Sequence, residues 1–291
     1  MATMKGNLFD PILVTDLVTK VRGKSSLAVL CDDTPVPFNG MKEFTFSMDN
    51  EIDIVAEGGK KTEGGITMEP ITIVPIKFEY GARVSNEFMY ATEDAQLDIL
   101  TAFNDGFAKK VAKGMDLAAM HGINPRTGTA STVVGTNNFD SKVTQTVTFA
   151  EATPDDNLEE AIALVQVDHD VTGMALSKKF GSAMSKVKAN GVKLYPEFAF
   201  GASPATLNGI GVSVNNTVSG GTEKDHGIVG DFQNAFKWGY AKEIPLEIIE
   251  YGDPDNSGKD LKGYNQVYIR AEIYLGWAIM MEKAFARIKE E

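Results

Sequence analysis

Few side chains in the sequence could do chemistry. His169 lies between two aspartates in the stretch VDHDV, a set that could hold a metal ion. Neighbouring residues of a strand point to opposite faces, and no second histidine follows at a ligand spacing, so we interpret the stretch as a polar loop after a helix. His121 could act as a base, but no GxSxG nucleophile motif accompanies it. We instead expect His121 in the last turn of a helix, where a histidine meets the negative end of the helix dipole.

Motifs for phosphate and dinucleotide binding are missing from the sequence. There is no GxxxxGK[ST], and the stretch NGIGVSV lacks the third glycine and the following helix of a dinucleotide fingerprint. The single cysteine, Cys31, cannot form a disulfide within the chain. A net charge of -12 gives no overall basic character for sequence-independent binding to nucleic-acid phosphates. We therefore predict no catalytic residue, no cofactor and no metal.

Two adjacent lysines stand among glycines and glutamates in the stretch EGGKKTEGG, residues 57–65. Apolar and polar residues alternate on both sides of it, as in strands; the apolar ones are Phe44, Phe46, Met48, Ile52 and Ile54 before it, and Ile66, Met68, Ile71, Ile73, Ile76 and Phe78 after it. The pattern predicts a long hairpin with a glycine-rich tip, and Pro70 and Pro75 remove backbone donors from its second arm. A two-stranded ribbon is only marginally stable in water, so we expect this one to lie on a partner.

Helical spacing follows the hairpin. Apolar residues fall three or four positions apart at Leu97, Leu100, Phe103, Phe107, Val111, Met115 and Ala118. They predict a helix that begins at about Ser85, its N-cap, and ends at His121, before Gly122. At ~1.5 Å per residue such a helix is over ~40 Å long, which makes it a spine for the rest of the chain.

The remaining sequence has a mixed pattern. Asp10 and Pro11 open a short predicted helix that ends just before Gly23, and residues 126–150 predict a second, shorter ribbon. Residues 153–250 read as a compact α/β block with helices in NLEEAIALVQV and KKFGSAMSKVKA, the latter ended by Asn190 and Gly191, and strands in GMALS, IGVSV, GIVGDF and LEIIEY. A β-rich segment, GYNQVYIRAEIYLGWAIMMEKAFARI, closes the chain, and we expect it to return to the spine.

This order of elements resembles the major capsid proteins of tailed phages of the Hong Kong 97 type, over nearly the whole chain. The most similar stretches are GDFQNAFKWGYAKEIPLEIIEYG and NQVYIRAEIYLGWAIMMEKAFARI, followed by VRGKSSL and ARVSNEFM. The resemblance implies an α+β fold in four parts. These are an N-terminal arm (1–40), an E-loop hairpin (41–83), a P-domain (84–153 and 251–291, with the spine helix at about 85–121) and an A-domain (154–250).

The resemblance implies a structural function and no enzymatic one. A protein of this type assembles into the hexamers and pentamers of an icosahedral head that encloses double-stranded DNA without sequence-specific binding. The implied partners are copies of the chain, a separate scaffolding protein, a portal and, as a further candidate, decoration proteins. The opening MATMK is typical of an initiator region, which favours separate scaffolding over a cleaved leading segment. Assembly is expected in the host cytoplasm, with no membrane, and the final location is the virion.

The resemblance also suggests roles for the lysines of EGGKKTEGG. We expect Glu57, Lys60, Lys61 and Glu63 to contact a neighbouring subunit through exposed ion pairs. Some members weld subunits by an isopeptide bond between an E-loop lysine and a P-domain asparagine, assisted by a glutamate. Lys60 or Lys61, Asn265 and Glu272 match that set; the neutral amine would attack the carboxamide while the carboxylate takes the proton. Simple ion pairing is the favoured expectation.

Two alternatives stay open from the sequence. The same fold forms bacterial encapsulin-like nanocompartments, which hold enzymes in place of DNA and would need a cargo-peptide groove on the inner face. The other alternative is a soluble α/β enzyme with its pocket in residues 154–250, although the sequence offers no nucleophile, metal or cofactor motif for it.

Overall fold

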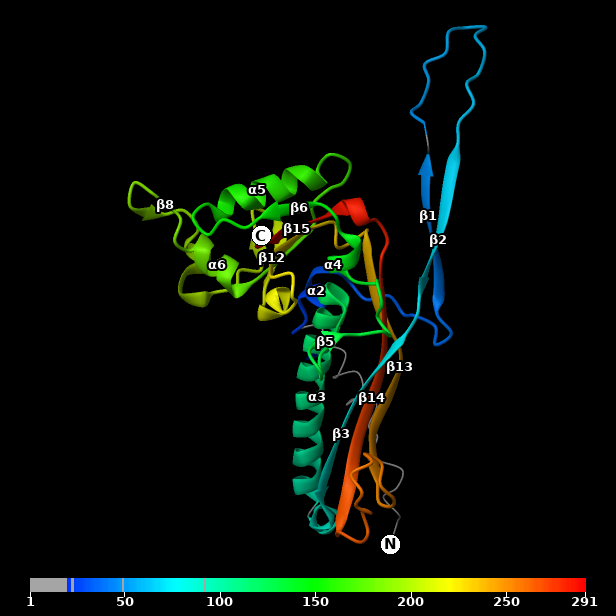
Figure 1. Ribbon diagram of the computed structural model, residues 1–291, viewed down its shortest axis with the longest axis vertical. Coiled ribbons are helices and arrows are strands. Elements are labelled where there is room, and N and C mark those ends of the chain that lie inside the picture. The colour runs from blue at the N-terminus through cyan, green and yellow to red at the C-terminus, as the bar shows by residue number, and fades with distance from the viewer. Residues whose placement is uncertain (1–19, 22–23, 49, 92) are drawn as a thin grey trace.

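The computed structural model describes residues 20–21, 24–48, 50–91 and 93–291. The short helix predicted after Asp10 lies outside these residues, except for Lys20 and Val21. The described chain has three parts: a long, narrow part with a three-stranded sheet, a compact part with a six-stranded sheet, and a hairpin that projects beyond both (Figure 1).

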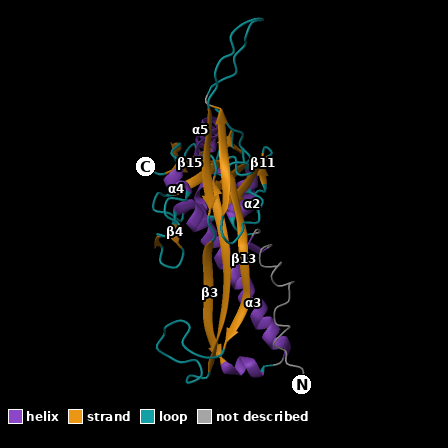
Figure 2. Cartoon of the chain, turned by 90° about the vertical axis from the view of Figure 1, so that its right-hand side faces the viewer, coloured by secondary structure: helices purple, strands orange, loops and turns teal. Residues whose placement is uncertain are grey.

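The long part combines one helix with one antiparallel sheet. Its strands lie in the order β13 (Phe236–Ile249), β14 (Gln266–Ile279), β3 (Ile76–Ser85). The helix α3 (Glu93–His121) runs along this sheet, as two views at right angles show (Figures 1 and 2). Phe107, Val111 and Met115 of α3 are buried in one cluster with Ile269 and Trp277 of β14. The 29 residues of α3 extend about 43 Å, so the predicted spine helix is confirmed.

The spine helix begins later than the sequence predicts. Ser85 is the last residue of β3 and pairs with Gln266 of β14, so its prediction as an N-cap is wrong. The strand continues to Ser85 because this pairing satisfies its backbone groups. A 3-10 turn, η2 (Asn86–Tyr90), then leads to α3. The end of the helix is as predicted: Gly122 has a φ of 65°, and its amide N–H donates to the carbonyl oxygen of Ala118.

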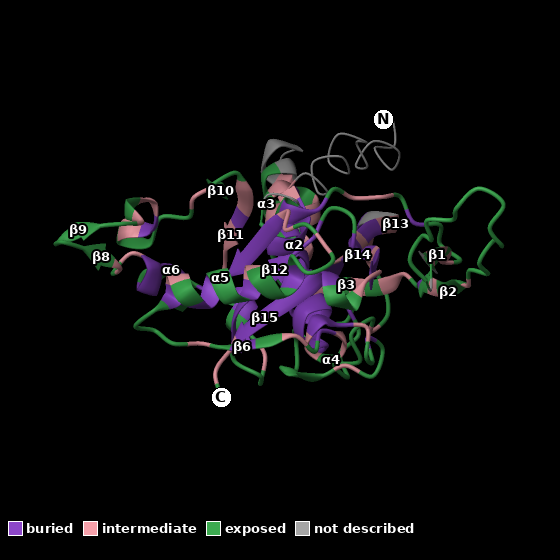
Figure 3. Cartoon of the chain, turned by 90° about the horizontal axis from the view of Figure 1, so that it is seen from above, coloured by how far each residue is buried: buried purple, intermediate pink, exposed green. Residues whose placement is uncertain are grey.

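The compact part is a mixed sheet with two helices. Its strand order is β10-β11-β7-β12-β15-β6, with parallel pairing of β7 to β11 and of β15 to β6. Leu158 of α5 (Pro154–Val165) and Phe180 of α6 (Lys178–Met184) are buried against the sheet, whose centre is seen from above in Figure 3. The strands are β6 (Thr146–Thr148), β7 (Gly173–Leu176), β10 (Thr206–Leu207), β11 (Ile210–Val214), β12 (Asp225–Gly230) and β15 (Phe285–Lys289).

Two segments fold differently from their predictions. Residues 126–150 form no ribbon; Asn138 caps α4 (Phe139–Lys142) by accepting a hydrogen bond from the backbone of Ser141. The segment KKFGSAMSKVKA is helical only as far as Met184. Asn190 and Gly191 both have positive φ and form the turn of a small hairpin, for which an Asn-Gly pair is well suited. Four strands of two residues each lie in or beside these two segments. They are β4 (Ile123–Asn124) and β5 (Thr129–Ala130) near the first, and β8 (Lys188–Ala189) and β9 (Val192–Lys193) in the small hairpin.

The strand predicted in LEIIEY belongs to a different sheet from the rest of the block 154–250. It forms the end of β13, which pairs along its length with β14. The last strand, β15, crosses in the opposite direction. It follows β14 of the long sheet in the sequence but joins the six-stranded sheet between β12 and β6. These two crossings tie the long and compact parts together.

The hairpin consists of β1 (Met41–Met48) and β2 (Ile66–Ile73), a two-stranded sheet on its own among the described residues. Its second arm ends at Ile73, because the chain changes partner at Pro75 and continues as β3 beside β14. Proline cannot donate to a ladder, which fits a break at this point. Ile73, fully buried with Val36 and Ala278, anchors the base.

The remaining described helices are short: α2 (Ser26–Leu30), η3 (Pro196–Gly201), η4 (Asn216–Ser219) and η5 (Glu282–Ala284). Within the described ranges, no helix combines the length and the apolar character that crossing a membrane would need.

Candidate functional sites: the hairpin face and a buried charge cluster

One face of the hairpin is apolar and uncovered. The register of β1 and β2 places Phe46 opposite Met68 and Met48 opposite Ile66, with Phe44 two residues earlier on the same face. These five side chains, which we call the hairpin face, are each between 56% and 71% exposed. An apolar surface of this kind on a projecting ribbon marks a contact site, because exposing it to water is unfavourable.

The opposite face of the hairpin is polar. Thr45 lies opposite Glu69 and donates from Oγ1 to the carbonyl oxygen of Glu69, while Glu43 pairs with Lys237 of β13 at 3.0 Å. Side chains alternate between the two faces of a strand, so a shift of one residue in the register would exchange the faces. The anchored base fixes the register, and the hairpin therefore presents its apolar face in one direction.

The tip of the hairpin carries the charged residues singled out in the sequence. Glu57, Lys60, Lys61 and Glu63 are all exposed and lie outside regular secondary structure. Gly58 has a φ of 77°, a backbone conformation that favours glycine at this turn. The tip lies at one extreme of the molecule (Figure 1), where its charges are free to reach a neighbouring molecule.

Asn265 and Glu272 do not come together within one chain. Both belong to the β14 region, but seven residues of extended strand separate them by roughly 23 Å. Asn265 is exposed and contacts Asn86, whereas Glu272 is buried and paired with Lys77 at 2.8 Å. A weld that used Lys60 or Lys61 with both residues would have to take them from different subunits.

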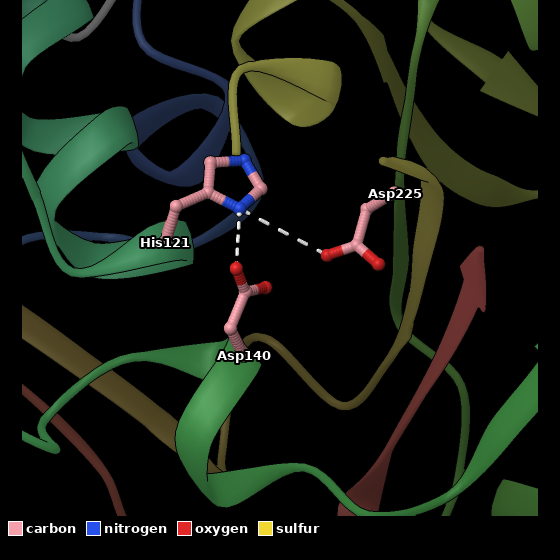
Figure 4. A group of neighbouring side chains, drawn as sticks. All are labelled: His121, Asp140 and Asp225. Carbon is pink, nitrogen blue, oxygen red and sulfur yellow. Dashed lines mark hydrogen bonds and ion pairs between the residues drawn. The ribbon is translucent and has the colours of Figure 1, made fainter. Parts of the chain in front are cut away.

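A cluster of charged side chains, absent from the sequence predictions, joins the end of α3 to the compact part. His121 Nδ1 lies 3.0 Å from Asp140 Oδ2 and 3.9 Å from Asp225 Oδ2 (Figure 4). Arg287 donates from Nε and Nη2 to both oxygens of Asp225, and its Nη2 lies 2.9 Å from Asp140 Oδ1. Four separate segments supply these residues, so no sequence spacing could have revealed them.

The hydrogen bonds determine how the cluster is charged. His121 Nε2 faces the carbonyl oxygen of Thr217 at 2.9 Å, so it carries a proton, while Nδ1 faces a carboxylate. Burial disfavours a charged ring, but the hydrogen bond to Asp140 and the nearby carboxylates outweigh it and raise the pKa of His121. Burial and Asp140 raise the pKa of Asp225, against the effect of Arg287.

The cluster also has the geometry of a possible metal site. One donor atom each of His121, Asp140 and Asp225 lies within 4.8 Å of the others. However, the guanidinium of Arg287 already contacts both carboxylates. Because Arg287 already supplies a cation to Asp140 and Asp225, we assign the cluster a structural role.

We expect the cluster to make folding stability depend on pH. His121 has a raised pKa in the folded protein, so its contribution is fully present below its unfolded value of about 6.5 and is lost as pH rises through the folded value. Raising the pH from about 6 to about 9 should therefore lower the free energy of unfolding of the wild type, measured with urea, and lower it less for His121→Gln. His169→Gln, in the loop after α5, is the matched control. Equal slopes for His121→Gln and the wild type would contradict this assignment.

A second buried carboxylate fixes the start of α2. Asp116 of α3 is fully buried and accepts hydrogen bonds from Ser25 Oγ at 2.5 Å, Ser26 N at 2.9 Å and Leu27 N at 3.3 Å. It also accepts from Thr217 Oγ1 at 2.8 Å. Burial raises the pKa of Asp116, and these four donors oppose that shift. The carboxylate thus holds two separate segments, residues 25–27 and the turn at Thr217, on the spine.

The block 154–250 contains a small cavity, and its lining supplies no nucleophile paired with a base. The cavity, about 170 Å³, lies against α5 and is lined by Leu158, Ile162 and Met174, with Asp155 and Glu159 beside them. Among the described residues that line it there is no serine, cysteine or histidine. A spine, two sheets tied by exchanged strands and an uncovered apolar hairpin together define a protein that assembles with other protein chains.

Comparison with known proteins identifies the kind of assembly. The model of the family described as "Phage capsid family" matches residues 5–289, so the chain belongs to the phage capsid family. It is a major capsid protein, a structural component of the virion that assembles with copies of itself into an icosahedral head, and not an enzyme. The predicted α+β fold of the Hong Kong 97 type is confirmed, and the enzyme alternative is excluded.

Solved structures agree with the family match. A chain from Mycobacterium phage Ogopogo is 33% identical, with a TM-score of 0.79 and coverage of 92% of each chain. A chain from Gordonia phage Cozz is 24% identical, with a TM-score of 0.76 and coverage of 92% of this chain and 87% of that one. The capsid of a native GTA particle shares the fold at 16% identity and a TM-score of 0.65, covering 91% of this chain and 89% of that one. No curated protein matches the chain.

Proposed function

We propose that the chain tiles the hexamers and pentamers of a head that encloses double-stranded DNA, and that each subunit lays its hairpin face on a neighbour. The observation that carries this proposal is the uncovered apolar face of Phe44, Phe46, Met48, Ile66 and Met68. Burying a side chain such as Phe or Met contributes roughly 1.5–3 kcal/mol, and every subunit of a shell repeats the contact. In this proposal 1–40 is the N-terminal arm, 41–83 the E-loop, 84–153 with 251–291 the P-domain, and 154–250 the A-domain.

The charged residues at the tip would orient the hairpin on the neighbouring subunit. Glu57, Lys60, Lys61 and Glu63 are exposed, and the subunit that they meet carries a net charge of -12, so the two lysines can pair with its carboxylates. Such ion pairs weaken as salt rises, whereas the apolar contact does not. A covalent weld of Lys60 or Lys61 to Asn265, with Glu272 taking the proton, is a further proposal that needs residues from several subunits.

The remaining partners are proposed on the resemblance alone. They are a separate scaffolding protein, a portal and decoration proteins, with assembly in the host cytoplasm. An acidic chain suits a wall that encloses DNA without gripping it, because like charges keep the packaged genome from adhering. This favours a head around DNA over an encapsulin-like compartment for enzymes.

Gel filtration and negative-stain microscopy of the purified chain, alone and with a scaffolding protein, test the proposed function. We expect ring-shaped capsomers or closed shells. A small, monodisperse species under both conditions would contradict the proposal. When the particles are boiled in denaturant, monomers on a gel exclude the weld, while a ladder of multimers that Lys60→Ala/Lys61→Ala removes would indicate it.

A further inference from the structure

Phe200, in the compact part, combines an uncommon backbone conformation with an uncovered aromatic ring. Its φ is 58° and its ψ is 26°, in the left-handed region that bulky residues rarely adopt. Its exposed fraction is 104%, whereas Phe198, two residues earlier, is buried in the core and fixes the turn from which Phe200 projects. Backbone strain of this kind costs free energy and is retained where it serves a function. The single chain gains little from a strained and uncovered phenylalanine, which indicates a contact outside the chain.

Two lysines beside Phe200 repel each other. Lys188 and Lys193 lie directly opposite each other in the pair β8–β9, and like charges in such a pair are destabilising. Both side chains are exposed, and within the described ranges neither makes an ion pair. Lys193 Nζ lies 5.5 Å from the centre of the Phe200 ring, so we treat Lys188, Lys193 and Phe200 as one projection, the knob. The strands β8 and β9 lie at the end of the compact part that is turned away from β1 and β2 (Figures 1 and 3).

The cavity against α5 is complementary to the knob in size and in charge. It has a volume of about 170 Å³ and a largely apolar lining that includes Leu158 and Ile162. An apolar cavity of about 150 Å³ is large enough to bind benzene, so a phenyl ring fits by size. Asp155 and Glu159 lie beside the same cavity, and burial, followed by these two carboxylates, raises the pKa of the nearby Tyr195. The cavity is therefore apolar within and negatively charged at its edge.

We propose that the knob of one copy of the chain docks at this cavity of a second copy. The ring of Phe200 enters the cavity, and the two lysines of the knob face Asp155 and Glu159, which relieves their mutual repulsion. Each copy carries one knob and one cavity, so it can give one contact and receive another, which is how rings of subunits are built. The proposal rests on the assembly of the chain with copies of itself, and it does not depend on the hairpin face.

Cross-linking of cysteine variants in assembled particles tests this contact. Ala202→Cys places a thiol next to the knob, and Glu159→Cys places one at the cavity. Both variants keep Phe200, the knob lysines and Asp155, and the native Cys31 is buried and should not react. With a short bismaleimide reagent, the double variant should give a ladder of multimers on a denaturing gel, and either single variant should give the pattern of untreated particles. Particles of the double variant that give no ladder would overturn the proposal and leave the proposed function intact.

Phe200→Gly separates a role in docking from a role in folding. Glycine adopts a positive φ without strain, so the urea midpoint of the unassembled chain should stay at or above the wild-type value. The yield of particles, counted by negative-stain microscopy, should fall severalfold because the ring is lost. Val167→Ala is the control, since it trims another exposed apolar side chain, 75% exposed in the loop after α5, and should assemble like the wild type. A wild-type yield of particles from Phe200→Gly, or a fall in its urea midpoint, would contradict the proposal.

Discussion

Replacing Phe46 with lysine is expected to abolish shell assembly and to leave the fold of the single chain intact. Phe46 is 56% exposed and lies in the middle of the hairpin face, so the isolated chain loses little when it changes. In an assembled shell the same side chain would be covered, and a lysine there would exchange roughly 1.5–3 kcal/mol of burial for the cost of desolvating a charge. The loss recurs in every subunit. Negative-stain particle counts measure it, and circular dichroism checks the fold.

Thr45→Lys is the matched control for the hairpin. It introduces the same side chain one residue away, on the polar face, opposite Glu69 and two residues from Glu43. We expect this variant to assemble like the wild type, because opposite charges across a strand pair are tolerated or favourable. Normal assembly of Phe46→Lys, or equal loss in both variants, would contradict a contact made by the apolar face alone.

The largest loss of stability is expected from Asp116→Asn. The substitution keeps the shape of the side chain but turns one acceptor oxygen into an N–H₂ donor. Since all four partners of Asp116 are donors, two of them lose their acceptor in the buried interior. Leaving buried donors unsatisfied and removing bonds to a charge should together cost roughly 3–5 kcal/mol in the free energy of unfolding. Urea denaturation of the unassembled chain measures it.

Asp105→Asn on the same helix is the control for Asp116→Asn. Asp105 pairs with Lys20, but its side chain is 44% exposed, and exposed ion pairs contribute at most about 1 kcal/mol. We expect the midpoint of its urea transition to stay close to the wild-type value. If the two variants unfold at the same urea concentration, Asp116 does not hold α2 on the spine.

The sequence predicted the elements that carry a regular pattern of apolar residues over a long continuous stretch. Apolar spacing from Leu97 to Ala118 predicted α3, and alternation on both sides of EGGKKTEGG predicted β1 and β2. The predicted start of the helix was wrong because strand pairing sets it. Ser85 suits an N-cap, but its pairing with Gln266 keeps it in β3. The Asn190-Gly191 pair is typical of a hairpin turn, but we interpreted it as the end of a helix over KKFGSAMSKVKA.

The buried sites could not be predicted from the sequence. Asp140, Asp225 and Arg287 come from α4, β12 and β15, and only the exchange of β15 into the six-stranded sheet brings them to His121. Arg83 pairs with Asp253 and Asp255 across about 170 residues of sequence. The apolar hairpin face was easier to predict from the sequence, since the period-two alternation of Phe44, Phe46 and Met48 places them on a common face.

The most direct measurement of the central claim is an electron cryomicroscopy map of the assembled particle at side-chain resolution. We predict that Phe44, Phe46, Met48, Ile66 and Met68 are covered by a neighbouring copy of the chain, with Lys60 and Lys61 near its carboxylates. A map in which these five side chains face solvent, or lie only against their own chain, would contradict the account.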